Sequence, residues 1–252
     1  MGGQGAWAQV AFEAVMATAS QARRGARWGR DVNTLSAARR EFARKRSPWM
    51  IAGAILVVGI IRLALGDFSW RDLVAVAAML VVYPFGEWAI HVYLLHMKPV
   101  RIAGRRIEPP AARDHRQHHE QPNDLTLILL AEKELAQLLL LAVPATVAFG
   151  ALIVGLLAGP VPIGPLVSAV LAGYFAIFVY EWTHFLIHTA HRPRSRYYRA
   201  VWRNHRLHHF KNEHYWHGIT NSVSDTVLGT NPEQSSVPRS RTARTLDPGP
   251  TG

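Results

Sequence analysis

The chain of 252 residues contains no cysteine, so its own side chains cannot form a disulfide, a thiolate zinc finger or an iron–sulfur cluster. Any metal must therefore be held by histidine and carboxylate. Charged residues are also scarce, at 18%, whereas apolar residues make up 49%. Low charge combined with long apolar runs is typical of a membrane protein rather than a cytosolic one.

The net charge of +11 at first suggests nucleic-acid binding, but the position of the basic residues argues against it. Of the 28 lysines and arginines, nine fall at 23–46, six at 98–116 and seven at 192–211. These blocks lie between apolar runs, as cytoplasmic loops do in membrane proteins. We therefore expect no nucleic-acid partner.

Four apolar segments are each long enough to cross a hydrocarbon core of about 30 Å, namely 49–65, 73–96, 135–159 and 166–188. Arg62, in the first of them, does not exclude a span, because an arginine near a helix end can extend to the headgroups. The connections between the first and second segments and between the third and fourth are short and lack basic clusters. We therefore predict an all-α integral membrane bundle of two helical hairpins in the cell inner membrane, with both termini and the loop 97–124 in the cytoplasm.

The segments outside the predicted membrane domain, 49–230, are basic or of low complexity. Residues 1–48 form a basic cytoplasmic lead without a signal peptide, in which an amphipathic helix over 34–46 is expected to lie on an anionic membrane surface. Residues 123–134 are expected to form an interfacial piece before the third span. Residues 231–252, and above all 233–252, are rich in proline, serine, arginine and glycine, which predicts a flexible tail.

Histidine is absent from the first 90 residues and from the last 35. By the predicted topology, all thirteen histidines lie at the cytoplasmic ends of the second and fourth spans or just after them. HRQHH at 115–119 and HRLHH at 205–209 each place three histidines on one side of a short helix, with prolines shortly before it. His91 and His96 are five residues apart, which an ideal helix would place about 140° apart, so we expect a bulge, a frayed turn or a helix end there.

An internal repeat organises these histidines. EWAIHVYLLH at 87–96 and EWTHFLIHTAH at 181–191 correspond, and each is followed by one HxxHH stretch. Ten imidazoles would thus meet at a single centre. Clustered imidazoles cannot all be charged, and each neutral ring has a lone pair that a transition metal can satisfy. Shared between two ions, ten ligands give about five nitrogens to each.

Two glutamates accompany the repeat. Glu87 and Glu181 each lie one turn before a candidate ligand, at a depth where a bare carboxylate is costly. They could accept the second N–H of a ligating imidazole and so fix its tautomer. The alternative is a carboxylate at a helix end that reaches water.

Spacing alone does not name the metal, because nitrogen ligands suit iron, zinc, copper and nickel. A hydrolytic zinc site normally uses three protein ligands, often from HExxH, and no HExxH occurs in this chain. A nitrogen-rich centre of two ions at a membrane face better fits redox iron and O₂. That chemistry can attack an unactivated C–H bond, of which membranes contain many.

Taken together, HVYLLH, HRQHH, HFLIH and HRLHH resemble the fatty acid hydroxylase superfamily, which includes sterol desaturases and sphingolipid, fatty-acid and carotenoid hydroxylases. HHFKNEHYWHGITNSVSDTVLGT at 208–230 also resembles the segment after the last histidine box of that family. The resemblance, over about 49–230, implies four transmembrane helices under a cytosolic helical cap with a di-metal site. It implies metal binding by His91, His96, His115, His118, His119, His184, His188, His205, His208 and His209. His191, His214 and His217 are candidates for a place behind the ligands or beside the substrate.

The resemblance further implies O₂-dependent hydroxylation or desaturation of a membrane lipid, with two iron ions as cofactor and O₂ as co-substrate; zinc could replace iron in recombinant samples. The 48-residue lead contains no histidine that could ligate haem, so we expect a separate electron donor, either a ferredoxin, a cytochrome or a reductase. A basic face suits an acidic donor. Hydroxylation and desaturation both begin with hydrogen abstraction, so the sequence leaves both open. A membrane protein that only binds or transports metal is the third hypothesis, although the first and third spans have few polar residues.

Overall fold

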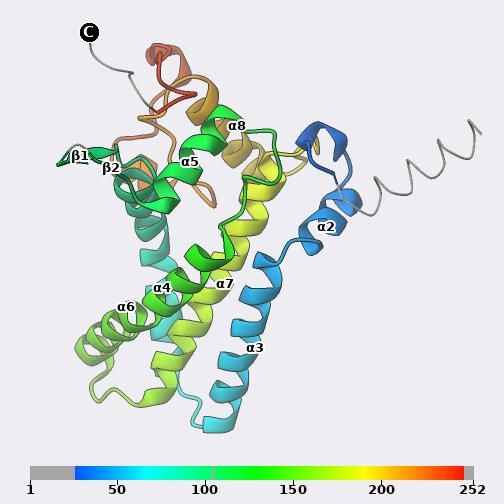
Figure 1. Cartoon of the computed structure of the whole chain (residues 1–252). Helices are drawn as coiled ribbons and strands as arrows, with labels where there is room; N and C mark the ends of the chain where they lie inside the picture. Colours follow the sequence, from blue (N-terminus) through cyan, green and yellow to red (C-terminus); the bar gives the residue numbers. More distant parts are fainter. Residues whose placement is uncertain (1–25, 104, 247–252) are drawn as a thin grey trace, which may run out of the picture.

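The computed structural model describes residues 26–103 and 105–246, which form a bundle of long helices below a cap of shorter elements (Figure 1). The bundle helices are α3 (Ser47–Leu65), α4 (Trp70–Ala89), α6 (Glu132–Ala158) and α7 (Ile163–Ile187). All four are long and apolar enough to cross a membrane, α4 together with the turn that continues it. The predicted all-α four-helix membrane bundle is confirmed.

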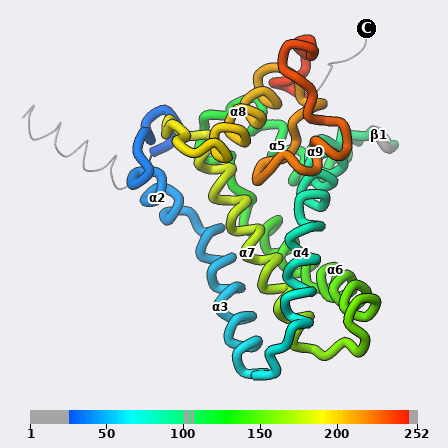
Figure 2. Tube along the Cα trace, turned by 180° about the vertical axis from the view of Figure 1, so that it is seen from behind, coloured from blue at the N-terminus to red at the C-terminus, as the bar shows by residue number. Residues whose placement is uncertain are grey.

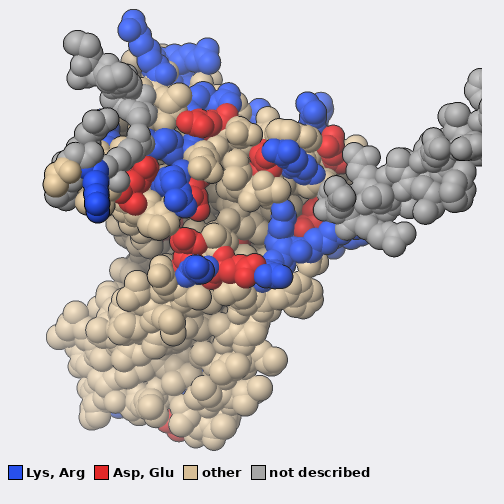
Figure 3. Space-filling model, in the orientation of Figure 1, with Lys and Arg blue, Asp and Glu red and all other residues tan. Residues whose placement is uncertain are grey.

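Apolar side chains cover the outside of the bundle. Leu80, Leu140 and Leu156 are largely exposed, and the face drawn in Figure 3 carries almost no charge over this part of the molecule. Helix α7 packs against α3, α4 and α6 and is the most buried of the four. An exposed apolar surface of this size is stable in lipid and not in water, so the bundle is the part that lies in the membrane.

Local sequence explains where these helices begin. Pro48 lies in the first turn of α3, where its missing N–H leaves no hydrogen bond unmade, and Ser69 and Asp72 form a reciprocal capping box for α4. Gly66 ends α3 with a φ of +66°. Each helix begins two or three residues before the predicted apolar segment. The difference arises because the first turns hold polar residues, glycine or proline, which carry no apolar signal.

Arg62 is compatible with the span, as expected, but it is paired inside the bundle. Its side chain is buried, at 2% exposed, in the last turn of α3. The guanidinium donates to Asp72 at 2.7 Å and to Ser168 at 2.8 Å, and it pairs with Asp67 at 3.1 Å. A buried cation needs such partners. Asp67 and Asp72 lie five and ten residues later, in the following turn and in α4, whereas Ser168 lies on α7, so the network ties α3 to both α4 and α7.

The cap is built around two short helices, α5 (Pro110–Glu120) and α8 (Arg196–Phe210), which lie side by side (Figures 1 and 2). The smaller cap elements are η1 (Gly29–Asp31), α2 (Leu35–Ala43), α9 (Val223–Val227), η3 (Gln234–Ser236) and an antiparallel hairpin of β1 (Val100–Ile102) and β2 (Arg105–Ile107). The hairpin was not predicted, because strands of three residues leave no readable period.

Helix α2 is shorter than predicted and packs on protein. Thr34 caps it, its hydroxyl accepting from the Ala37 N–H. On its apolar side Phe42 is buried against Phe185 of α7 and the loop before α6, where Leu125 is fully buried. The apolar face that we expected on the membrane surface therefore stabilises the cap. Residues 1–25 of the predicted lead lie outside the described residues.

The segment after α9 is ordered over 231–246, unlike the flexible tail that its composition predicted. Val237, Ala243 and Leu246 are all buried. Arg244 donates from Nε to the His119 carbonyl at 2.9 Å and from Nη2 to the Glu120 carbonyl. Backbone and side-chain hydrogen bonds hold this segment in place, although its sequence has no apolar periodicity from which order could be predicted. The last six residues, 247–252, lie outside the described part of the chain.

Candidate metal centre

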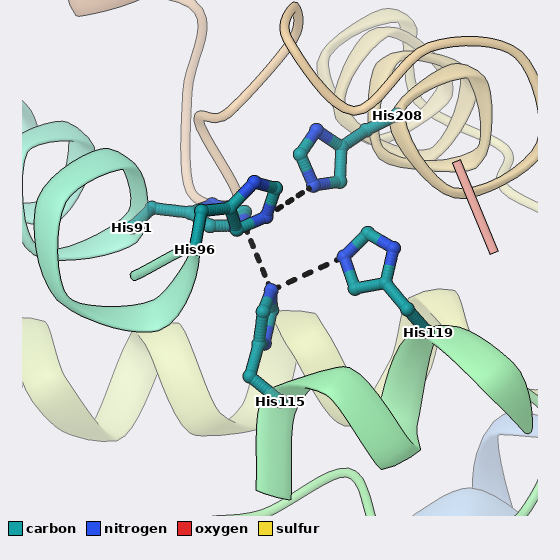
Figure 4. A group of neighbouring side chains, drawn as sticks. All are labelled: His91, His96, His115, His119 and His208. Atoms are coloured by element: carbon teal, nitrogen blue, oxygen red, sulfur yellow. Dashed lines mark hydrogen bonds between the residues drawn. The ribbon is translucent and has the colours of Figure 1, made fainter. Parts of the chain in front are cut away.

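All ten predicted ligands come together in the cap, where they form two neighbouring groups of five. In each group, one nitrogen from every ring lies within 4.8 Å of the others. Set A contains His91, His96, His115, His119 and His208, and set B contains His118, His184, His188, His205 and His209. In Figure 4 the rings of set A, from three separate helices, point toward a common centre.

The end of α4 brings two ligands of set A to one side by widening the helix. Ile90–Leu95 form a single π turn, η2, and the His96 N–H donates to the His91 carbonyl at 3.1 Å. Residues five apart lie above one another in a π turn, so both rings face the centre. The predicted local irregularity is confirmed. Helix α7 needs no such irregularity, because His184 and His188 are four residues apart.

Each HxxHH helix contributes to both sets. On α5, His115 and His119 belong to set A, whereas His118 belongs to set B. On α8, His205 and His209 belong to set B, whereas His208 belongs to set A. In a helix, residues i and i+4 lie nearly above one another, whereas residue i+3 points about 100° away from residue i+4. The pattern therefore places each short helix between the two sets.

Nitrogen atoms face nitrogen atoms across set A. His115 Nε2 lies 3.2 Å from His91 Nε2 and 3.2 Å from His119 Nε2, and His96 Nε2 lies 3.2 Å from His208 Nε2 (Figure 4). Backbone carbonyls, which only accept, contact the other ring nitrogen of three of these residues. His91 Nδ1 contacts the His217 carbonyl at 2.6 Å, and the Nδ1 atoms of His119 and His208 contact the Ala243 and Tyr215 carbonyls at 2.8 Å.

Those carbonyl contacts fix the proton on Nδ1 and leave the lone pair on Nε2. His115 Nε2 thus faces two lone pairs, of which it can donate to only one. A cation in the middle is the group that satisfies all of them. The carbonyls themselves could not be predicted, because any residue type supplies one.

Set B shows the same need through its unpaired atoms. His205 Nε2 lies 2.9 Å from His188 Nε2 and 3.0 Å from His209 Nε2. Both ring nitrogens of His118 and the Nε2 of His184 are buried without a hydrogen-bond partner among the described residues. Burial, followed by neighbouring imidazoles, lowers the pKa of His118 and His205 well below 6.5, so these rings are neutral at pH 7. Buried neutral imidazoles without partners fit a metal site.

Glu87 and Glu181 do not bind the imidazoles, so that prediction is wrong. Glu87 accepts from the backbone N–H groups of Ile219 and Thr220. Glu181 accepts from the Leu130 N–H and the Ser47 hydroxyl. Each carboxylate instead accepts a hydrogen bond from a loop. The donor in that loop lies two residues beyond a residue whose backbone binds one of the predicted ligands. These residues are His217, which binds His91, and Ile128, which binds His184. The repeat thus extends to the support of the ligands.

The three remaining histidines lie in different places. His217 is 4% exposed, and its ring centroid is 5.2 Å from that of His208. Its backbone N–H donates to Asp225, a residue that the sequence did not single out. His191 stacks on Tyr198. The side chain of His214 is 68% exposed. Of the three, only His217 lies directly behind a ligand.

The segment 238–246 completes the surroundings of set A, and its loss should weaken one ion. Truncation after Val237 removes the Ala243 carbonyl that orients His119. We expect the set A ion to bind about 10–100-fold more weakly, as is typical when such a support is lost, while the set B ion is retained. Chelator competition measures both affinities. Truncation after Leu246 is the matched control, and equal behaviour of the two truncations would contradict the role of this segment.

Acid is expected to destabilise the protein and to release its ions. Burial lowers the pKa of His119 to about 4 and holds that of His205 well below 6.5. Between about pH 6.5 and 4 the unfolded chain therefore binds protons that the folded chain does not. Stability is unaffected above this window and falls as the pH drops through it. Thermal unfolding and bound metal measured from pH 7.5 to 5 test this, and a flat profile would refute it.

Fold and site together define an integral membrane protein whose cap can hold two metal ions in histidine. The sequence model of the fatty acid hydroxylase family matches residues 76–230, more than half of the chain and all ten histidines of the two sets. The chain therefore belongs to the fatty acid hydroxylase family.

A solved structure described as full-length Scs7p, with only the hydroxylase domain visible, has a similar fold. The TM-score is 0.56 and the identity 21%, over 77% of this chain and 69% of that one. The comparison with curated proteins gave no match. The family match ends at 230, so the segment that holds His119 through the Ala243 carbonyl lies beyond it.

Proposed function

We propose that this protein is an oxidoreductase that hydroxylates a C–H bond of a membrane lipid with O₂ at a pair of iron ions. The family supports lipid hydroxylation in general. The observation that carries the finer proposal is the pair of five-histidine sets, side by side and buried, with lone pairs directed inward. The proposed ligands are the ten histidines of sets A and B.

The nature of the donors favours iron over hydrolytic zinc. Each set offers five nitrogens and no carboxylate among the described residues. A hydrolytic zinc ion normally has three protein ligands and a water. Iron held by imidazoles supplies redox chemistry with O₂, in which one oxygen atom enters the C–H bond and the other leaves as water. The balance requires two electrons from a donor and two protons. Zinc in a recombinant sample would occupy the same ligands without this activity.

The protein's own contribution is to place and protect this chemistry. The histidines of η2, which continues α4, and those at the end of α7 lie at the cap ends of membrane helices, so the centre is at the level where a lipid chain would meet the cap (Figure 2). Nearly complete burial of the rings excludes bulk water. The unit that carries the function is 49–230 together with α2 and 231–246, because both pack against it.

Topology supports a cytoplasmic cap in the cell inner membrane. Lysine and arginine gather over the cap in Figure 3, and basic residues favour the cytoplasmic side. Electrons would come from a separate ferredoxin, cytochrome or reductase, for which a basic surface suits an acidic partner. Desaturation on the same centre remains the alternative reaction, since it begins with the same hydrogen abstraction.

Lipid analysis tests the proposal. The chain and its His208→Ala variant are expressed in one host under ¹⁸O₂, and the extracted lipids are compared by untargeted mass spectrometry. We expect a lipid that gains one labelled oxygen atom and is absent with the variant. A loss of two hydrogens would instead show desaturation. Metal uptake into liposomes without any lipid product or O₂ consumption would overturn the enzymatic proposal.

A further inference from the structure

Two carbonyls that orient histidines of α7 come from one loop, which connects α5 to α6. The Pro122 carbonyl accepts a hydrogen bond from the ring of His188, and the Ile128 carbonyl accepts one from the ring of His184. Both histidines belong to set B. The orientation of these two ligands therefore depends on the contacts that hold the loop in place.

A segment near the start of the described chain holds this loop. Residues 26–32, which we call the strap, contain η1 and lie beside the end of α7 (Figures 1 and 2). The Gly29 N–H donates to the Asn123 carbonyl at 2.8 Å, and the Leu125 N–H donates to the Arg27 carbonyl at 2.8 Å. The strap thus pairs with the loop through its backbone, between the two carbonyls that orient the ligands.

A buried carboxylate adds a side-chain contact to this pairing. Asp124 is 2% exposed, and one of its oxygens accepts from the Arg27 guanidinium at 3.0 Å. The other oxygen accepts from the Thr126 N–H at 3.0 Å and from the Thr126 hydroxyl at 2.7 Å. A buried carboxylate with a full set of donors holds one position, so it fixes the loop against the strap.

The strap also contacts the end of α7 directly. The Ala190 N–H donates to the Gly29 carbonyl at 2.9 Å and to the Val32 carbonyl at 3.0 Å. A Cβ at position 29 would overlap the His188 carbonyl oxygen. Glycine is therefore required at this position, because only a residue without a side chain lets the strap approach the ligand so closely.

We infer that the strap positions His184 and His188 and thereby sets the affinity of set B, but not of set A, for its metal ion. Gly29 is the central positioning residue, because it contacts both the loop and the ligand. The inference rests on the proposed pair of ions and not on the reaction that they perform.

Set A draws its support from another part of the chain. The carbonyls that orient its rings belong to Tyr215, His217 and Ala243. The strap also lies before residues 76–230, which the family model matches. It is therefore a support that this chain adds to the ligands of one ion from outside the matched region.

Zinc affinity tests the inference without turnover. The full-length protein is loaded with zinc in detergent, and a chelator competes for both ions. In Gly29→Ala the new methyl group displaces His188, so we expect one ion to bind about 10–100-fold more weakly and the other to be unchanged. Gly53→Ala is the matched control, since it lies at an exposed position of α3 where a methyl group meets no neighbour within 4 Å. It should change neither affinity.

Paired variants identify the weakened ion. His115→Ala with His119→Ala leaves the set B ion, and adding Gly29→Ala should weaken that ion about 10–100-fold. His184→Ala with His205→Ala leaves the set A ion, and adding Gly29→Ala should not change its affinity. Equal weakening in the two backgrounds would reveal a general loss of stability and overturn the inference. Unchanged zinc affinity in both backgrounds would overturn it as well.

Asp124→Asn supplies a second variant, which weakens the contact with Arg27 without adding an atom to the loop. We expect the set B ion to bind about three- to tenfold more weakly. Asp31→Asn, an exposed carboxylate of the same strap, is its control and should leave both ions in place. Equal zinc affinities in these two variants would contradict the inference even if Gly29→Ala failed to fold.

The zinc measurements also keep this inference apart from the proposed function. If the strap variants left the set B ion unchanged, the role of the strap would be refuted and the proposed hydroxylation would stand. Conversely, selective weakening of the set B ion without any lipid product in the host would support the strap and count against the hydroxylation.

Discussion

Replacing His115 and His118 together by alanine is expected to remove both metal ions, whereas replacing His115 and His119 should remove only one. His115, His118 and His119 lie within one turn or so of α5, so their separation in the sequence does not distinguish the two double variants. The structure does, because His115 and His119 belong to set A and His118 belongs to set B. Elemental analysis of purified protein gives the number of ions per chain.

Activity should be lost in both double variants, by on the order of 1,000-fold or more, because groups that act as a unit fail together. The ion count is therefore the informative measurement. His191→Ala and His214→Ala are the matched controls, since those imidazoles lie outside both sets. They should retain two ions and full activity. Loss of both ions in the His115 and His119 variant, with an unchanged unfolding temperature, would argue against two separate sites.

The sequence predicted the parts of this site that depend on local periodicity. Four apolar lengths predicted four helices, and histidine spacings of three and four predicted which rings share a helix face. The five-residue spacing of His91 and His96 predicted a departure from the α-helix, which is the π turn of η2. These inferences hold because helix geometry relates a residue only to neighbours within about one turn.

The exchange of His118 and His208 between the sets could not be predicted, because it depends on how α5 and α8 lie across each other. The supporting groups were missed for a different reason. The Ala243 and Tyr215 carbonyls orient ligands without any side-chain signature. Glu87 was noticed, yet its role was misassigned, since a carboxylate one turn before a histidine can equally hold a loop behind it. Long-range partners of this kind become visible only in three dimensions.

Reversing the charge of Arg199 and Arg203 is expected to slow electron delivery by about tenfold or more at low ionic strength. Both arginines lie on the outer side of α8 and are exposed, whereas His205, His208 and His209 are buried on its inner side. One helix, about 10 Å across, thus separates a basic surface from both sets. Neither arginine has a carboxylate partner within 26–103 or 105–246; Arg199 donates to the Arg194 carbonyl and Arg203 to the Asn204 amide oxygen.

An acidic donor would be steered to this face, and steering weakens with salt because the Debye length falls. The Arg199→Glu, Arg203→Glu variant should therefore differ from the unaltered protein most at low salt and least at high salt. Arg39→Glu, Arg40→Glu on α2 changes the net charge equally, at exposed positions of another helix, and serves as the control. With dithionite, which needs no docking surface, both variants should turn over normally. Equal slowing of electron delivery by the two charge reversals would show that the effect comes from the overall field of the cap. The outer side of α8 would then not be the face through which electrons enter.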